Sequence, residues 1–344
     1  MKKFDYIVGN PAYQLDSPGE QKTFAPPVYH KFMDAAYEMG TVVELVTPGR
    51  FLFDAGSTPK AWNQKMLHDP HLKVLQYERD ASKFFPNTEI KGGVVITYHD
   101  SARNYGPIGV FTEHKELHCI LQKIKSVNPK AQSLTLIMYN QTRFDLESLY
   151  AKFPEYRSVI GSSGQDKRFR NNIFEKIDAF HSSPQTATDV EVWGVINNKR
   201  VRRYIPISFV DQINGNLSKW KVLLPAATGS GQLGEIFSTP LIVGPYVGFT
   251  QTFISIGAFD TKDEALNAEK YIKTKFSRAM LSILKNTQHN AIPAWEHVPL
   301  QVFTSDGDID WSQSVADIDH QLYRKYGLSD DEIEFIETHV KEMV

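Results

Sequence analysis

The chain has 344 residues, enough for two domains, and a net charge of −2. Its content of 41% hydrophobic and 12% aromatic residues excludes intrinsic disorder. No apolar run reaches the length of a bilayer span and we find no charged-then-apolar leader, so we expect neither a membrane segment nor secretion. The single cysteine, Cys119, excludes an intrachain disulfide and fits a reducing cytoplasm, and the small net charge means that nucleic-acid binding would depend on local basic patches.

Up to residue 126, strand-like and helix-like segments alternate. Strands are predicted at 4–9, 41–48, 72–78 and 92–99, with 108–112 as a partner for the last, and helices at 28–39, 58–69 and 114–126. We expect the 58–69 helix to start with Thr58 as its N-cap and Pro59 at its first position. The alternation predicts an α/β layer with a largely parallel sheet.

From about residue 127 the pattern changes to short apolar segments separated by clusters of Gly, Pro, Ser and Asn. Segments such as "VEVWGVI", "KWKVLLP" and "PLIVGPYVGFTQTFISIGAF" are typical of strands in a mixed or antiparallel domain. Helices are predicted at 263–286 and 329–343, and the second opens with a Ser-x-x-Glu capping box. We therefore expect an α/β domain over 1–130 and an α+β domain over 131–344.

The sequence Asn-Pro-Ala-Tyr at residues 10–13 directly follows the first predicted strand. Asn-Pro at a strand end is an ordinary turn starter, and the four letters alone are common. Their position is more informative, because ligands of α/β sheets bind at the carboxyl ends of the strands. Asn10 offers an amide oxygen, Pro11 a free carbonyl and Tyr13 a ring face, a set that suits a planar molecule with an exocyclic amino group.

The segment "DYIVGNPAY" resembles the Asn-Pro-Pro-Tyr motif of N6-adenine DNA methyltransferases of restriction–modification systems. The likeness continues in "VYHKFMDAAYEMGTVVELVTPGRFLF", which resembles the next helix and strand, and in "KFFPNTEIKGGVVITYH", which resembles a later strand. The segments "KYIKTKFSRAMLSILKNTQHNAIPAWEHVPLQVF" and "LYRKYGLSDDEIEFIETHVKEM" resemble the ends of target-recognition domains. The resemblance implies a partial Rossmann-like methyltransferase sheet over 1–130, followed by an α+β DNA target-recognition domain over 131–344.

The resemblance also implies roles for the motif. The Asn10 side chain and the Pro11 carbonyl would accept hydrogen bonds from the adenine amino group, Tyr13 would stack on the flipped base, and Phe85 would pack against its edge. A flipped base is required because the target atom cannot be reached within a stacked duplex. Ala12 replaces the second proline of the family motif, which loosens the turn but removes no contacting group. The implied cofactor is S-adenosylmethionine, and the implied partner is double-stranded DNA.

In this family the S-adenosylmethionine site lies mostly upstream of the motif, as a strand, a glycine-rich turn and an acid after the next strand. Only nine residues precede Asn10, so we expect this half of the sheet to be absent and the chain to be inactive alone. The strand at 4–9 would then be an exposed sheet edge, which is an aggregation liability unless it is covered. We therefore expect a second polypeptide, or a second copy of this chain, to pair with it.

Gly229, Gly231 and Gly234 have G-x-G-x-x-G spacing after a predicted strand. A cofactor-binding turn of this kind opens a helix of useful length. Here Pro240 follows soon, and the next segment has the pattern of a strand. The sequence therefore favours a glycine-rich loop of the recognition domain over a cofactor site.

Two basic clusters, "DKRFRNN" and "NNKRVRRY", lie in the expected recognition domain. Solvated surface is the simplest account of a charge run. Arg and Lys interleaved with Asn, Phe and Tyr nevertheless suit phosphate contacts and base-edge reading. We expect DNA contacts from both clusters, namely from Lys167, Arg168, Arg170, Lys199, Arg200, Arg202 and Arg203.

Other functions remain open. A metal-dependent endonuclease would use Asp80, Glu89 and Lys91, whose spacing mimics an acid…Glu-x-Lys pattern that holds Mg²⁺, although such spacing is common by chance. A non-catalytic DNA-recognition subunit of a restriction–modification system would use the basic clusters alone. His114 and His118 have the spacing of zinc ligands on a helix, but a solvated helix face explains them more simply, and we expect no metal.

Overall fold

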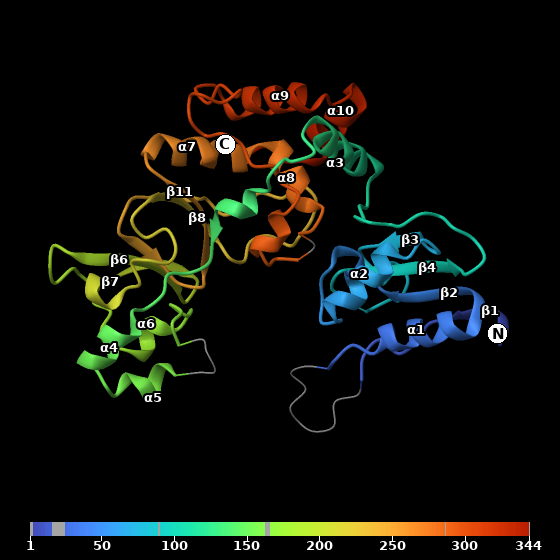
Figure 1. The fold of residues 1–344 in the computed structure, drawn as a ribbon, viewed down its shortest axis with the longest axis horizontal. Coiled ribbons are helices and arrows are strands. Elements are labelled where there is room, and N and C mark those ends of the chain that lie inside the picture. The colour runs from blue at the N-terminus through green and yellow to red at the C-terminus, as the bar shows by residue number, and fades with distance from the viewer. Residues whose placement is uncertain (1–2, 16–24, 89, 162–165, 286, 344) are drawn as a thin grey trace. The chain divides into compact units, whose positions relative to one another are not determined.

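The computed structural model describes residues 3–15, 25–88, 90–161, 166–285 and 287–343. The chain divides into two compact units, residues 1–118 (unit 1) and 119–344 (unit 2), and each is described by itself (Figure 1). The division falls inside helix α3 (Lys115–Val127), whereas the composition of the chain predicts a boundary near residue 130. Both units combine helices with strands, so the expected α/β class is confirmed.

The elements of unit 1 lie within two residues of the predicted bounds. Its strands are β1 (Phe4–Gly9), β2 (Gly40–Pro48), β3 (Leu72–Glu78) and β4 (Val94–Asp100), its helices before α3 are α1 (Tyr29–Met39) and α2 (Lys60–His68), and its 3-10 turns are Gly49–Phe53 and Ala81–Lys83. Residues 108–112, however, form no strand. Phe111 instead packs edge-on against Phe53 and Tyr77, with ring centroids 5.4 Å from each, so this segment covers the core as a loop.

The sheet of unit 1 has the strand order β1-β2-β4-β3. β1 and β2 are parallel, whereas β4 runs antiparallel to both β2 and β3. β1, β2 and β3 thus run in one direction. The prediction of a largely parallel sheet is nevertheless wrong, because two of the three pairs of neighbouring strands are antiparallel. The reason is the connection between β3 and β4, whose described residues form a short 3-10 turn and no crossover helix, so the chain returns in the opposite direction.

Helices α1 and α2 pack into one core with this sheet (Figure 1). α1 contributes Met33 and Tyr37, which lie one turn apart on its buried face. The predicted N-cap of α2 is wrong: the helix begins after Pro59, which occupies the cap position without a side-chain hydrogen bond. The hydroxyl of Thr58 donates to Oδ1 of Asn63 at 2.7 Å and is therefore not used to cap the helix.

The described residues of unit 2 form two small sheets and several helices. Its strands are β5 (Met138–Tyr139), β6 (Asp189–Ile196), β7 (Lys199–Pro206), β8 (Trp220–Pro225), β9 (Leu241–Val243), β10 (Val247–Phe249) and β11 (Phe253–Phe259). Its helices after α3 are α4 (Leu146–Lys152), α5 (Tyr156–Ile160), α6 (Ile173–Lys176), α7 (Lys262–Lys273), α8 (Lys275–Ser282), α9 (Val315–Tyr326) and α10 (Asp330–His339), with 3-10 turns at Leu134–Ile137, Ile207–Phe209 and Ile292–Trp295. The sheets have the strand orders β10-β6-β7 and β5-β11-β8-β9. Among the described strands of this unit, β10 and β6 are parallel, and the other neighbouring strands are antiparallel.

The predicted helix over 263–286 is broken at Thr274 into α7 and α8. The backbone of Thr274 is extended, and its hydroxyl donates to the carbonyl of Tyr271 at 2.6 Å and accepts from the N–H of Ser277 at 3.1 Å. This residue therefore ends one helix and caps the next. The capping box predicted for the C-terminal helix is confirmed at the start of α10. Within the described ranges, no helix has the length and apolar character that crossing a membrane requires.

Candidate functional site

The Asn-Pro-Ala-Tyr turn lies at the carboxyl edge of the unit 1 sheet. β1 ends at Gly9 and its parallel neighbour β2 ends at Pro48, so the residues that follow both strands meet at one edge. The 3-10 turn after β2 brings Arg50 to the same edge. In α/β sheets this is the edge at which ligands bind.

A cavity of about 850 Å³ opens at this edge, within the range of small-molecule sites. Its described lining comes from the turn after β1, the start of α1, the end of β2, the loop before α2 and the loop between β3 and β4. Asn10, Tyr13 and Phe85 all line it, whereas Pro11 is not among the lining residues. The structure therefore brings together three residues that the sequence singles out from two distant segments.

Tyr13 and Phe85 form an edge-to-face aromatic pair at the cavity wall. Their ring centroids are 6.5 Å apart and the ring planes meet at 73°, a geometry that aromatic pairs favour. The Tyr13 hydroxyl is buried and has no hydrogen-bond partner among the described residues, and burial raises the pKa of this hydroxyl. Tyr13 is therefore a neutral phenol near neutral pH, and its ring rather than a negative charge faces the cavity.

The charged side chains in the described lining are both basic, Arg50 and Lys91, and no described carboxylate lines the cavity. This charge distribution favours an anionic ligand. From the sequence, Lys91 is expected only in the nuclease alternative. Arg50 does not stand out there, because its local sequence, Pro-Gly-Arg-Phe, has the features of an ordinary turn. The pairing of β2 with β1 is what brings Arg50 beside the motif.

The glycine-rich loop in unit 2 is an anion site that is filled by a side chain of its own unit. The carboxylate of Glu235 accepts hydrogen bonds from the backbone N–H of Ser230 at 2.6 Å and of Gly231 at 3.0 Å, and it pairs with the ammonium of Lys285. A Cβ atom added at Gly229 would lie 2.2 Å from the same carboxyl group. These contacts leave no room for a cofactor phosphate, and they agree with the preference for a structural loop.

The second basic cluster lies on β7, where two of its arginines are held by contacts within unit 2. The guanidinium of Arg202 lies 5.6 Å from the Trp193 ring centroid and 3.7 Å from the carboxylate of Glu191. Arg200 donates to the carbonyl of Thr239 at 2.7 Å. These contacts fix the directions of both side chains.

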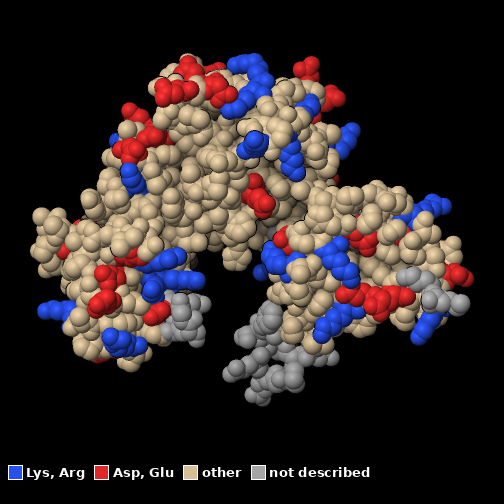
Figure 2. Space-filling view, viewed as in Figure 1, with Lys and Arg blue, Asp and Glu red and all other residues tan. Residues whose placement is uncertain are grey.

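The first basic cluster precedes α6. Lys167 and Arg168 are exposed, whereas their neighbour Phe169 is buried in the core of unit 2, and Arg170 donates to a backbone carbonyl at 2.6 Å. Phe169 belongs to the same core cluster as Ile205 of β7, so both basic segments cover one part of unit 2. Figure 2 shows Lys and Arg side chains, with Asp and Glu side chains among them, over the region that holds α6 and β7 in Figure 1.

Of the residues that the nuclease alternative names, Asp80 has a local structural role. Asp80 accepts hydrogen bonds from the backbone N–H of Ser82 at 3.0 Å and from its hydroxyl at 2.7 Å, so its carboxylate caps a 3-10 turn. Glu89 lies outside the described residues. Across the described ranges, no group of three or more His, Cys, Asp or Glu side chains is arranged to hold a metal ion.

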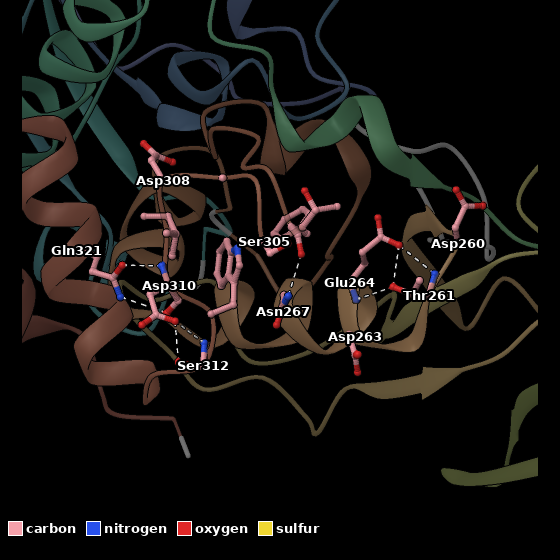
Figure 3. Close-up of a pocket in the computed structure, with 15 residues that line it drawn as sticks. Asp260, Thr261, Asp263, Glu264, Asn267, Ser305, Asp308, Asp310, Ser312 and Gln321 are labelled. Atoms are coloured by element: carbon pink, nitrogen blue, oxygen red, sulfur yellow. Dashed lines mark hydrogen bonds between the residues drawn. The ribbon is translucent and has the colours of Figure 1, made fainter.

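A second cavity, of about 910 Å³, lies in unit 2 beside the start of α7 (Figure 3). Five acidic residues line it: Asp260, Asp263, Glu264, Asp308 and Asp310. Two of them stabilise local structure, since Glu264 accepts from the N–H of Thr261 at 2.9 Å and Asp310 accepts from the N–H of Ser312 at 3.0 Å. Such an acidic surface repels phosphate groups, so we do not expect nucleic acid to bind at this cavity.

In unit 1, the first strand of an α/β sheet is followed by Asn-Pro-Ala-Tyr, beside a cavity with aromatic lining at the carboxyl edge of the sheet. Residues 1–85 match the family model of the Eco57I restriction-modification methylase. An uncharacterized adenine-specific methylase of Mycoplasma pneumoniae is 28% identical over 94 residues. The chain therefore contains a segment like the adenine methyltransferases of restriction–modification systems, as the sequence resemblance implies.

These matches cover parts of longer proteins. The match to the Mycoplasma methylase spans 27% of this chain and 22% of that protein. Among solved structures, the type IIL restriction-modification enzyme MmeI, determined in complex with DNA, aligns with 97% of this chain and 56% of its own chain, at 9% identity and a TM-score of 0.39.

Proposed function

We propose that this chain is the base-binding and DNA-recognition part of a site-specific adenine-N6 DNA methyltransferase. The observation that carries the proposal is the meeting of Asn10, Tyr13 and Phe85 at one cavity. The amide oxygen of Asn10, which lines that cavity, accepts a hydrogen bond from the adenine amino group. In the proposal the second acceptor is the carbonyl of Pro11, which belongs to the same turn but is not among the lining residues. The rings of Tyr13 and Phe85 hold the flipped base.

The methyl donor of such a reaction is S-adenosylmethionine, and the described residues do not provide a complete site for it. The glycine-rich loop of unit 2 is filled by Glu235, and no described carboxylate lines the unit 1 cavity to bind ribose hydroxyls. We propose that another polypeptide, or a second copy of this chain, holds the donor, and that the chain is inactive alone.

The proposed partner would cover β1. This strand pairs with β2 on one side and has no strand on its other side among the described residues. Phe4, Tyr6 and Val8, which alternate along it, are 54%, 73% and 78% exposed. Because alternate residues of a strand share one face of the sheet, β1 combines an unpaired edge with an exposed apolar face. A bound partner would cover both and prevent unwanted strand pairing.

In the same proposal, unit 2 recognises duplex DNA through its basic clusters. Lys167, Arg168 and Lys199 are exposed and free to contact phosphates. Arg202, stacked on Trp193, presents a guanidinium in a fixed direction, as base-edge reading requires.

The test is methyl transfer to duplex DNA, together with calorimetry of S-adenosylmethionine binding, for the chain alone and with candidate partner polypeptides. In the assembled enzyme Asn10→Ala should lower transfer by about 10²–10³-fold, the effect of losing one preorganised hydrogen bond. The control Asn104→Ala, at an exposed asparagine of the same unit, should change transfer little. Unchanged transfer in Asn10→Ala, or no donor binding in any combination, would contradict the proposal. Selective duplex binding without transfer would identify a non-catalytic recognition subunit.

A further inference from the structure

Arg50 lines the unit 1 cavity from the 3-10 turn after β2. Its Nε atom is buried and has no hydrogen-bond partner in the described part of the chain. Arg50 as a whole is partly exposed, but a buried N–H group is normally hydrogen-bonded, because leaving it without an acceptor is costly. An N–H without an acceptor at a cavity wall indicates a ligand that supplies one.

The aliphatic stem of Arg50 is held between two glycines. A Cβ atom at Gly92 would lie 2.4 Å from Cγ of Arg50, and one at Gly56 would lie 3.3 Å from Cβ of Arg50. Both glycines have positive φ, 87° and 91°, so glycine is needed for the backbone as well as for the close approach. The two loops therefore fix the direction of the Arg50 side chain before any ligand binds, which lowers the entropic cost of binding.

The rest of the cavity limits the chemistry of the ligand. Lys91 is the other charged residue of the described lining, so the charge of the wall favours an anion. Tyr13 and Phe85 provide aromatic contacts in the same cavity, which favours a ring attached to that anion. A planar guanidinium binds phosphate through two parallel hydrogen bonds. A nucleotide combines the ring with the phosphate.

We propose that Arg50 holds the phosphate group of the nucleotide whose base lies against Tyr13 and Phe85. The choice of adenine as the base rests on the proposed function, whereas the phosphate contact rests on the geometry around Arg50. In this arrangement Arg50 is a binding residue that anchors the flipped nucleotide by its backbone, while Asn10 identifies the amino group.

The test compares the affinity of the full chain for 2′-deoxyadenosine 5′-monophosphate, 2′-deoxyadenosine and inorganic phosphate by calorimetry. The monophosphate should bind about tenfold more tightly than the nucleoside, as one charge-assisted contact provides. Arg50→Met, which keeps an aliphatic stem between the glycines, should remove this preference and leave nucleoside affinity unchanged, and Arg50→Lys should keep part of it. The control Arg103→Met, at an exposed arginine of the same unit, should keep all of it. Thermal unfolding checks that each variant folds. If Arg50→Met does not fold, the preference of Arg50→Lys for the monophosphate over the nucleoside decides the test.

Equal affinity of the wild-type chain for nucleoside and monophosphate would overturn the inference. So would an Arg50 variant that weakens both ligands alike, or inorganic phosphate binding as tightly as the nucleotide. A loss confined to S-adenosylmethionine binding would assign Arg50 to the donor carboxylate and would overturn it too. Equal affinity for the monophosphates of deoxyadenosine and deoxycytidine, with the Arg50 effect intact, would contradict the adenine-specific function while supporting the phosphate contact.

Discussion

Glu235→Gln is expected to destabilise unit 2 strongly. The Glu235 carboxylate accepts from the N–H groups of Ser230 and Gly231 and pairs with Lys285. The Lys285 side chain is 2% exposed, so its ammonium is removed from water and depends on this carboxylate for charge compensation. An amide at position 235 would leave that ammonium with neutral oxygen acceptors only, namely the amide oxygen and the backbone carbonyls of Thr228 and Thr287, and with no charge to compensate it.

Removing one partner of a buried ion pair costs about 3–5 kcal/mol. In a unit of this size each kcal/mol lowers Tm by about 2–4 °C. The free energy of unfolding is measured by urea titration with tryptophan fluorescence. Glu264→Gln is the control, because glutamine also serves in an exposed capping box, and it should cost less than about 1 kcal/mol. Adding Lys285→Met to Glu235→Gln should restore part of the loss, since no buried charge then lacks a partner.

The same prediction has a pH dependence. Burial by itself raises the pKa of Glu235, but Lys285 and the loop N–H groups outweigh it and hold the pKa below its usual value of 4.5. The folded carboxyl thus stays ionised where the unfolded one is protonated, so its stabilisation is complete above pH 4.5 and is lost as the pH falls through the folded pKa. The difference between wild type and Glu235→Gln should shrink in that range. Equal stabilities at neutral pH would refute the reasoning.

Two further predictions concern a buried lysine and the sheet edge. Burial lowers the pKa of Lys221 to about 7, so above that pH the unfolded state binds a proton that the folded state has lost, and the stability of unit 2 should rise with pH. Lys221→Met should flatten this rise in urea titrations from about pH 7 to 10, and an unchanged slope would exclude Lys221 as its source. Val8→Lys should abolish partner capture or self-association in size-exclusion chromatography while leaving Tm unchanged. Leu75→Lys, at an exposed position on β3, is its control, and association that survives Val8→Lys would place the interface elsewhere.

Several features of this chain follow from local sequence. The helix and strand bounds of unit 1 could be predicted to within two residues, because hydrophobic periodicity and turn residues act over short distances. The capping box of α10 could also be predicted, from Ser329 and Glu332. The break at Thr274 could not be predicted from the sequence, because its neighbours have strong helical periodicity and only the extended backbone of this residue divides the helix.

Some features of the candidate site likewise follow from local sequence, whereas others depend on tertiary structure. The sequence by itself determined the Asn10–Tyr13 turn at a strand end and identified Phe85 through the family resemblance. Only the tertiary structure placed these residues at one cavity with Arg50, because strand pairing and two glycine loops bring distant segments together. It also decided that the anion of the glycine-rich loop is Glu235, since the charge that balances it, Lys285, comes from the end of α8. Contacts between residues far apart in the chain leave no periodic pattern in the sequence, so chain topology alone decides them.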